Sequence, residues 1–165
     1  AWETLLAAGP ANSNKFSRLL LLSIETASAH QVCPTFAPEL QTIVGGRTTA
    51  WHDIENFNDI TNMKFNYIEE TSPLLLTVIQ NELAITKNVI LGNNNDQGFF
   101  TGGAMTLHLG FDQELLGLIC LSCYPTWGIK PFTPKHKPPM FLYHGRKDPL
   151  IPIMIPGFVK QWYES

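Results

Sequence analysis

Residues 88–108 constrain the fold more than any other part of the sequence. They begin with an apolar run at 89–92 that is typical of a buried strand, and they end with small and apolar residues that favour a helix. Between these two parts, Gly98 and Gly102 flank Phe100 symmetrically. Glycine is needed where a helix approaches a strand closely. The stretch therefore predicts a strand, a tight turn and a helix that packs back on the strand.

Short apolar runs alternate with helical patterns along the rest of the chain, which is typical of a parallel sheet with crossover helices. The length suits one hydrophobic core, so we expect a single domain over residues 1–165. The expected strands are residues 18–23, 89–92, 116–122 and 140–144.

Helices are expected after residue 71, over residues 103–111 and over residues 158–163. In the first of them Ser72 suits the N-cap and Pro73 suits the first turn. Residues 1–6 also look helical, and residues 129–139 read as an exposed loop. The apolar face of the first helix would consist of Leu74, Val78, Ile79 and Leu83.

Several motifs follow one another in an order that resembles the acyl-protein thioesterase and carboxylesterase family of α/β-hydrolases. They are Cys-Pro-Thr-Phe-Ala-Pro at 33–38, the Trp-His-Asp loop within 44–54, Gly-Phe-Phe-Thr-Gly-Gly at 98–103, Cys-Leu-Ser at 120–122 and His-Gly-Arg-Lys-Asp at 144–148. The resemblance implies an α/β-hydrolase-like, mostly parallel sheet with flanking helices. It also implies hydrolysis of carboxylic esters or acyl thioesters.

The resemblance assigns roles to individual positions. Asp148 stands at the position of the catalytic acid, Phe100 at that of the nucleophilic serine of Gly-x-Ser-x-Gly, and the Thr101 N–H at that of an oxyanion donor. Trp51 and Phe100 would form apolar walls of the acyl groove. From the residues alone, Asp148 before Pro149 has a second interpretation, because this pair also initiates turns.

The nucleophile and the base of a serine hydrolase are both missing. Phenylalanine has no nucleophilic atom, so position 100 cannot form an acyl-enzyme. No histidine follows Asp148 in this chain. We interpret His144 as structural and His52 as a solvated loop residue. Thr101 and Ser122 are disfavoured as replacement nucleophiles, because Thr101 is β-branched at a strained turn and no base is evident near Ser122.

Changes elsewhere in the chain favour loss of activity. No segment before Trp2 resembles the oxyanion loop of the family, and residues 93–97 insert a polar run that we expect to displace the turn. We therefore expect a partial domain, incomplete at both ends, that is an inactive member or a fragment. The alternatives are a non-catalytic acyl- or protein-binding module that uses the same groove, and an enzyme completed by another chain. Exposed edges of the sheet and uncovered apolar faces would lead to self-association.

Composition narrows the range of partners. The net charge of −3 and the lack of a basic block argue against nucleic acid. No apolar run has the roughly 20 residues that a membrane-spanning helix needs. The histidines lack zinc spacing, so neither a metal nor a cofactor is expected. By resemblance, the ligand is an acyl ester or an S-acylated protein.

The three cysteines argue against a disulfide framework. Cys120 and Cys123 have the spacing of a redox pair, but on a strand they would face opposite sides, so we expect core roles. Residues 15–29 weakly resemble a signal peptide, yet their apolar part is short and internal, which favours a core strand. With no glycosylation sequon, the sequence predicts a cytoplasmic location.

Overall fold

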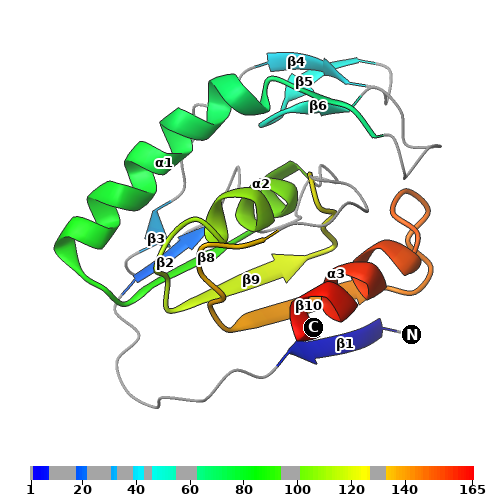
Figure 1. The fold of residues 1–165 in the computed structure, drawn as a ribbon. Helices are drawn as coiled ribbons and strands as arrows, with labels where there is room; N and C mark the ends of the chain where they lie inside the picture. Colours follow the sequence, from blue (N-terminus) through cyan, green and yellow to red (C-terminus); the bar gives the residue numbers. More distant parts are fainter. Residues whose placement is uncertain are drawn as a thin grey trace.

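A six-stranded sheet lies at the centre of the computed structural model (Figure 1), which describes residues 2–7, 18–21, 31–32, 39–42, 46–54, 63–93, 101–126 and 133–165, with side chains from residue 50 onward. The strand order is β1-β10-β9-β8-β2-β3, and all neighbours are parallel except β1 and β10. The six strands are β1 (Trp2–Ala7), β2 (Arg18–Leu21), β3 (Gln31–Val32), β8 (Val89–Gly92), β9 (Gly117–Leu121) and β10 (Met140–Gly145).

The four strands expected from the apolar runs are confirmed as β2, β8, β9 and β10, with ends that shift by at most two residues. Two small antiparallel sheets precede the first helix in sequence: β4 (Glu39–Thr42) pairs with β5 (Gly46–Thr49), and β6 (Asp53–Ile54) pairs with β7 (Phe65–Asn66). The structure thus has the α/β architecture with a mainly parallel sheet that the sequence predicts.

The helical interpretation of residues 1–6 is wrong. These residues form β1, which pairs antiparallel with β10 from Trp2 opposite Gly145 to Ala7 opposite Met140. An unpaired β10 would leave a row of backbone donors and acceptors open to water or to another chain. A six-residue ladder satisfies them, and this outweighs the local helical pattern.

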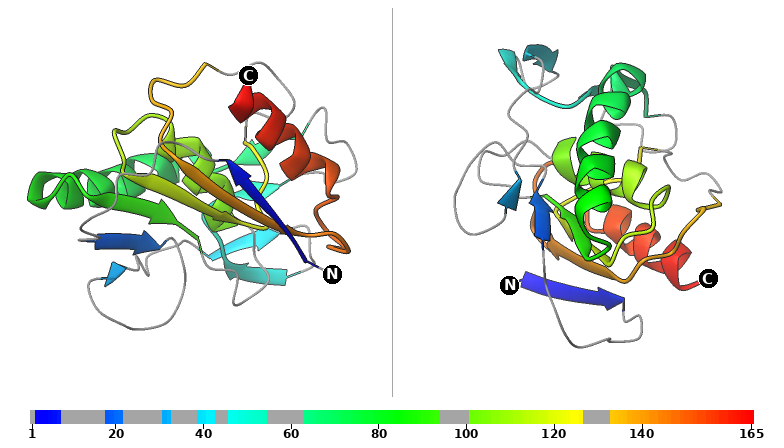
Figure 2. Two further views of the ribbon diagram at one scale, coloured as in Figure 1. Left: turned by 90° about the horizontal axis from the view of Figure 1, so that it is seen from below. Right: turned by 90° about the vertical axis from the view of Figure 1, so that its left-hand side faces the viewer.

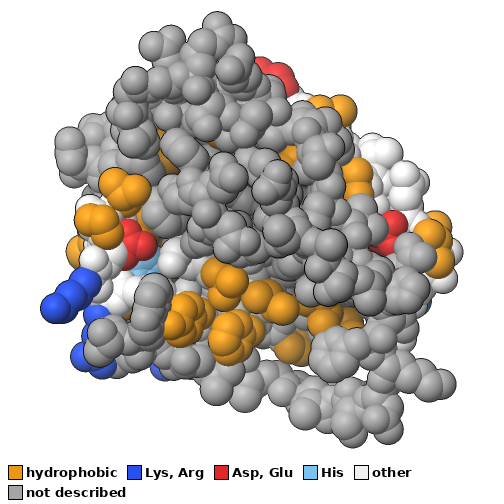
Figure 3. Space-filling view, turned by 180° about the vertical axis from the view of Figure 1, so that it is seen from behind, with side chains coloured by type: hydrophobic (Ala, Val, Ile, Leu, Met, Phe, Trp, Pro, Cys, Tyr) orange, Lys and Arg blue, Asp and Glu red, His pale blue; other side chains and the backbone are white. Residues whose placement is uncertain are grey.

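The helices α1 (Ile68–Ile85), α2 (Thr101–Gly110) and α3 (Met154–Glu164) lie on the same side of the sheet (Figure 2). On this side, alternate strand residues such as Leu118 and Leu142 are buried in the main core. The residues between them, such as Ile119 and Phe141, are only half-buried. Figure 3 views the molecule from behind and shows hydrophobic side chains on that face.

The first helix begins earlier than the sequence predicts. Its N-cap is Tyr67, which has a left-handed φ of 68°, so Ser72 is not the cap and Pro73 lies inside the helix. The hydroxyls of Thr71 and Ser72 instead donate to the carbonyls of Tyr67 and Ile68, at 2.8 and 2.6 Å. Such hydroxyl-to-backbone bonds to the residue four positions earlier are common within helices and often bend them.

The buried face of α1 is also rotated relative to the expected one. Leu75 and Ile79 are fully buried, whereas Leu74 is 50% exposed. The α3 helix begins at Met154 rather than at residue 158, because Pro156 falls in its first turn, where a backbone N–H is not needed. The second helix begins two residues before its expected start.

Gly103 determines how closely α2 approaches the sheet. A Cβ built there would lie 2.5 Å from the Cβ of Cys123 and 3.1 Å from the Asn93 side-chain nitrogen. A contact of this length cannot be accommodated without movement of the helix or the strand. The sequence predicts that the helix approaches the strand closely at Gly98 and Gly102. In the described residues, the close contact is at Gly103.

We expect Gly103→Ala to destabilise the protein by roughly 1–3 kcal/mol, the usual cost of overpacking a core. Gly157→Ala is the matched control, because that glycine lies in α3 with nothing within 4 Å of its Cβ position. Alanine in a helix is better than glycine by roughly 0.5–1 kcal/mol, so this variant should be more stable. Urea unfolding measures both changes. A Gly103→Ala protein as stable as the wild type would contradict the packing account.

Candidate active site

The candidate site lies where the parallel strands β8, β9 and β10 end. Because these strands are parallel, their carboxyl ends meet at one edge of the sheet, where α/β folds bind ligands. The next residues along the chain include Asn93 after β8, Ser122 after β9 and Asp148 shortly after β10. The α2 helix also begins at this edge, with Thr101.

Asn93 joins the exits of β8 and β9. Its side-chain nitrogen donates to the Leu121 carbonyl and its side-chain oxygen accepts from the Leu121 N–H, both at 2.8 Å. Its own N–H donates to the carbonyl of Ile119 at 3.2 Å. The carboxamide thus extends the ladder by one residue beyond β8. The first residue of the polar insertion is therefore buried and bonded to the sheet, while residues 94–97 lie outside the described residues.

Ser122 ends β9 in a left-handed conformation, with a φ of 47°. Its N–H donates to the carbonyl of Tyr143 on β10 at 2.8 Å. This turn brings Cys123 back beside Cys120, so the prediction that the two cysteines face opposite sides is wrong. Both thiols are free and buried, and burial raises the pKa of Cys120, with a further contribution from the hydrogen bond to Cys123. Their expected core role is confirmed.

Asp148 and His144 together brace the loop after β10. One carboxylate oxygen of Asp148 accepts from the N–H groups of Leu150 and Ile151, both at 2.9 Å. The Nε2 of His144 donates to the Ile151 carbonyl at 2.8 Å and lies 3.8 Å from the other oxygen of Asp148. Asp148 thus has the turn contacts that its position before Pro149 suggests. Its role as catalytic acid stays a prediction.

Trp51 and Thr101 meet at the start of α2. The backbone N–H of Trp51 donates to Thr101 Oγ1 at 3.2 Å, and both residues are buried. The Thr101 N–H belongs to the first turn of the helix, where backbone donors have no acceptor within the helix. The indole of Trp51 is 2% exposed and packs in the main core. The expected roles of both residues in substrate binding and oxyanion stabilisation stay predictions.

His52 is fully buried, so its interpretation as a solvated loop residue is wrong. Its Nε2 lies 3.3 Å from the Tyr124 hydroxyl, and its ring meets Phe65 and Tyr124 edge-on. The rings of Phe65 and Tyr124 are stacked on each other. Burial lowers the pKa of His52 to about 3, so the imidazole is neutral near pH 7. His52 is therefore a neutral member of a small aromatic cluster with Phe65 and Tyr124.

A second core cluster connects these parts of the site. It contains Ala104 of α2, Tyr124 after β9, Ile151 of the Asp148 loop, Ile155 of α3 and Ile54 of β6. The start of α2, the aromatic cluster of His52 and the Asp148 loop are therefore packed into one unit. Phe100 and Gly98, which the sequence places at the centre of the turn, lie outside the described residues.

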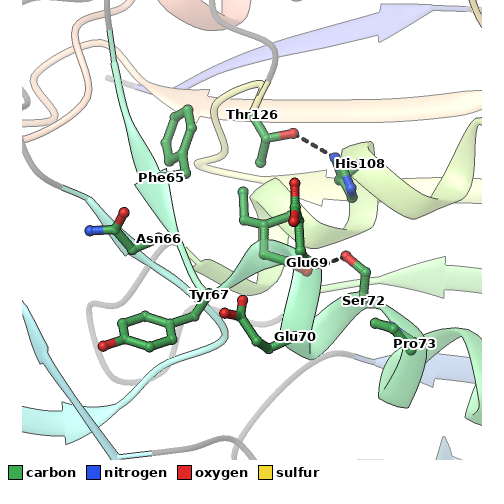
Figure 4. A pocket seen from close by; sticks show the side chains of 10 residues that line it. Phe65, Asn66, Tyr67, Glu69, Glu70, Ser72, Pro73, His108 and Thr126 are labelled. Atoms are coloured by element: carbon green, nitrogen blue, oxygen red, sulfur yellow. Dashed lines mark hydrogen bonds between the residues drawn. The ribbon is translucent and has the colours of Figure 1, made fainter.

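A cavity of about 630 Å³ opens between β7, the start of α1, α2 and the segment after β9 (Figure 4). His108 Nδ1 lies 2.8 Å from Thr126 Oγ1 on its lining. Burial lowers the pKa of His108, and the charge of Asp112 opposes this shift. The rest of the lining is Phe65, Asn66, Tyr67, Ile68, Glu69, Glu70, Ser72 and Pro73. The cavity is not predictable from local sequence patterns, because it forms only where His108 and Thr126 fold against residues 65–73.

The described residues contain neither a metal-binding cluster nor a membrane-spanning helix. No group of three or more His, Cys, Asp or Glu residues among them is arranged to hold a metal ion. Within the same residues, no helix has the length and apolar character needed to cross a membrane.

The sheet order, the helix packed on the exit of β8 and the acid-bearing loop after β10 define an α/β-hydrolase fold. The family model described as Phospholipase/Carboxylesterase matches residues 12–165. The chain therefore belongs to the phospholipase/carboxylesterase family, whose substrates are carboxylic esters. Neither a curated protein sequence nor a solved structure matches the chain significantly.

The burial of His52 predicts a pH dependence of stability. Its pKa is about 3 in the folded chain and about 6.5 for an ordinary histidine, so between these values the unfolded state binds more protons. This contribution is complete above pH 6.5 and is lost as the pH falls towards 3, with a slope approaching about 1.4 kcal/mol per pH unit.

We expect His52→Phe to lose stability less steeply than the wild type over this range, because phenylalanine does not titrate. Denaturant unfolding at a series of pH values measures the difference. His136→Phe is the matched control, since that side chain is exposed, and it should keep the wild-type slope. Parallel curves for the wild type and His52→Phe would contradict the buried, neutral state of His52.

Proposed function

We propose that this family member recognises acyl esters or S-acylated proteins without hydrolysing them by the serine route of the family. The observation that carries the proposal is Phe100 at the middle of Gly98-Phe-Phe-Thr-Gly102. An acyl-enzyme needs a nucleophilic atom at that position, and a phenyl ring has none. A base supplied by another chain would not restore the route, because the missing nucleophile is internal to the sequence.

The contacts of neighbouring groups support the loss of activity. The hydroxyl of Thr101, which follows position 100 in the sequence, accepts the Trp51 N–H and is buried. One oxygen of the Asp148 carboxylate accepts two backbone N–H groups of its own loop. His144, the imidazole near that carboxylate, is buried and bonded to the Ile151 carbonyl. None of these groups is arranged as an activated nucleophile with its base.

In this proposal Trp51 and Phe100 form the apolar walls of the acyl groove, and the Thr101 N–H contacts the acyl carbonyl oxygen. The binding of an acyl chain needs only apolar surface and shape, so it survives the loss of the nucleophile. A cytoplasmic location and self-association through incompletely covered surfaces belong to the same proposal. The half-buried apolar residues on the rear face of the sheet support self-association.

The cavity between β7, α1 and α2 favours a second candidate for the binding function. Its walls include the rings of Phe65 and Tyr67, and its polar groups include the hydrogen-bonded pair His108 and Thr126. A concave site with apolar walls and a few polar groups is what a small ligand requires. In this alternative the chain binds an ester ligand there, away from the position of the lost serine.

A long-chain acyl thioester of a short peptide tests the proposal. We expect saturable binding, followed by titration of protein fluorescence, and recovery of intact thioester by mass spectrometry after prolonged incubation. Retained binding without free thiol is the predicted result, because no nucleophile is present at position 100. Catalytic release of thiol that scales with protein concentration would contradict the proposal.

Two alanine variants locate the binding. Phe100→Ala should weaken it several-fold if the groove beside α2 is used, since a large apolar contact is lost. Tyr67→Ala removes an exposed aromatic residue from the other cavity and should leave the affinity unchanged. The opposite pattern would assign the binding to the cavity of Figure 4.

A further inference from the structure

The loop between β10 and α3 exposes an unusual concentration of large apolar side chains. Leu150 is 40% exposed, Ile153 is 37% exposed and Met154 is 64% exposed. They are three of the seven large hydrophobic residues that are exposed in the described part of the chain, and they lie within five consecutive positions. Pro149 and Pro152 between and beside them are exposed as well. We name residues 149–154, which comprise the end of this loop and the first residue of α3, the apical loop; all of them except Ile151 are exposed.

The exposure of the apical loop is fixed by hydrogen bonds. The Asp148 carboxylate accepts the N–H of Ile151, and the His144 imidazole donates to its carbonyl. Ile151 is thereby held in the second core cluster, while its neighbours on both sides point outward. The loop presents its apolar side chains from a braced backbone, so their exposure does not require the loop to unfold.

Two positively charged residues lie just before the apical loop in the sequence. Arg146 and Lys147 directly precede Asp148, and both side chains are exposed. The carboxylate of Asp148 is turned towards the backbone of the loop. In Figure 1 this region lies at the right-hand side, and at the corresponding left-hand edge of Figure 3 hydrophobic side chains lie beside Lys and Arg side chains.

We propose that the apical loop, with Arg146 and Lys147, docks the protein reversibly on an anionic phospholipid surface. Leu150, Ile153 and Met154 enter the boundary between headgroups and acyl chains, and the two cations contact the anionic headgroups. The exposed apolar side chains suit the acyl-chain boundary of such a surface, and the adjacent positive charges suit its anionic headgroups. Isolated apolar residues elsewhere, such as Leu74 on α1, lie close to Glu69 and Glu70 and do not match it.

Docking through this loop goes beyond ester recognition and does not depend on whether the chain hydrolyses anything. It would place the strand ends β8, β9 and β10 on the side of the molecule that faces the lipid, because the loop follows the carboxyl end of β10. The protein would then meet esters and S-acylated proteins that are already held at a membrane.

Vesicle cosedimentation of the purified full chain tests the proposal. We expect binding to vesicles of phosphatidylcholine that contain phosphatidylserine, weaker binding to phosphatidylcholine alone, and weakening as salt is raised. The double variant Ile153→Ser/Met154→Ser should bind roughly tenfold less, because it loses the apolar insertion. Arg146→Gln/Lys147→Gln should bind several-fold less to the anionic vesicles only.

The double variant Leu74→Ser/Ile85→Ser is the matched control, because it removes two exposed apolar side chains from α1, of which Ile85 is 65% exposed. It should bind vesicles like the wild type, and thermal melting confirms that all variants are folded. Absence of vesicle binding by the wild type would overturn the proposal, as would equal losses in both apolar variants. If the Ile153→Ser/Met154→Ser change instead abolishes self-association in light scattering and leaves vesicle binding unchanged, the loop contacts a second copy and the proposal is also overturned.

Discussion

Two hydrogen bonds between the Asn93 carboxamide and the backbone of Leu121 hold the ends of β8 and β9 in register, and the site depends on this connection. Gly103 can pack against Cys123 and Asn93 only while these strand ends stay together, so the position of α2 follows from it. The Ser122 N–H continues the connection to Tyr143 on β10. The polar insertion therefore starts by reinforcing the sheet edge at which α/β-hydrolases place their chemistry.

The apolar runs predicted β2, β8, β9 and β10 because the inner strands of a parallel sheet are recognisable from composition alone. Residues 1–6 were misread because their strand depends on pairing with β10, a contact more than a hundred residues away that no local pattern encodes. The earlier start of α1 is not predictable from Pro73, because this residue usually marks the first turn of a helix and here lies inside it. For β1, the tertiary contact outweighs local propensity.

The site was predictable only where the motif itself carries the chemistry. Asp148 could be placed after β10 from the His-Gly-x-x-Asp pattern, and its second interpretation as a turn residue is supported by its contacts with Leu150 and Ile151. His52 was misjudged because burial among aromatic rings depends on Phe65 and Tyr124, which lie on other segments. Tyr124 also belongs to the second core cluster, Phe65 packs against it, and this cluster joins the start of α2 to the loop after β10.

We propose that this protein keeps the phospholipase/carboxylesterase fold and lacks the family's covalent chemistry. The decisive measurement is the intact mass of the chain after treatment with a fluorophosphonate probe. A family enzyme that the probe labels is the positive control, and circular dichroism shows that the chain is folded. We expect the folded chain to keep its unmodified mass, because Phe100 has no nucleophilic atom that could attack phosphorus. A stoichiometric adduct localised to one residue would contradict it and would identify the nucleophile.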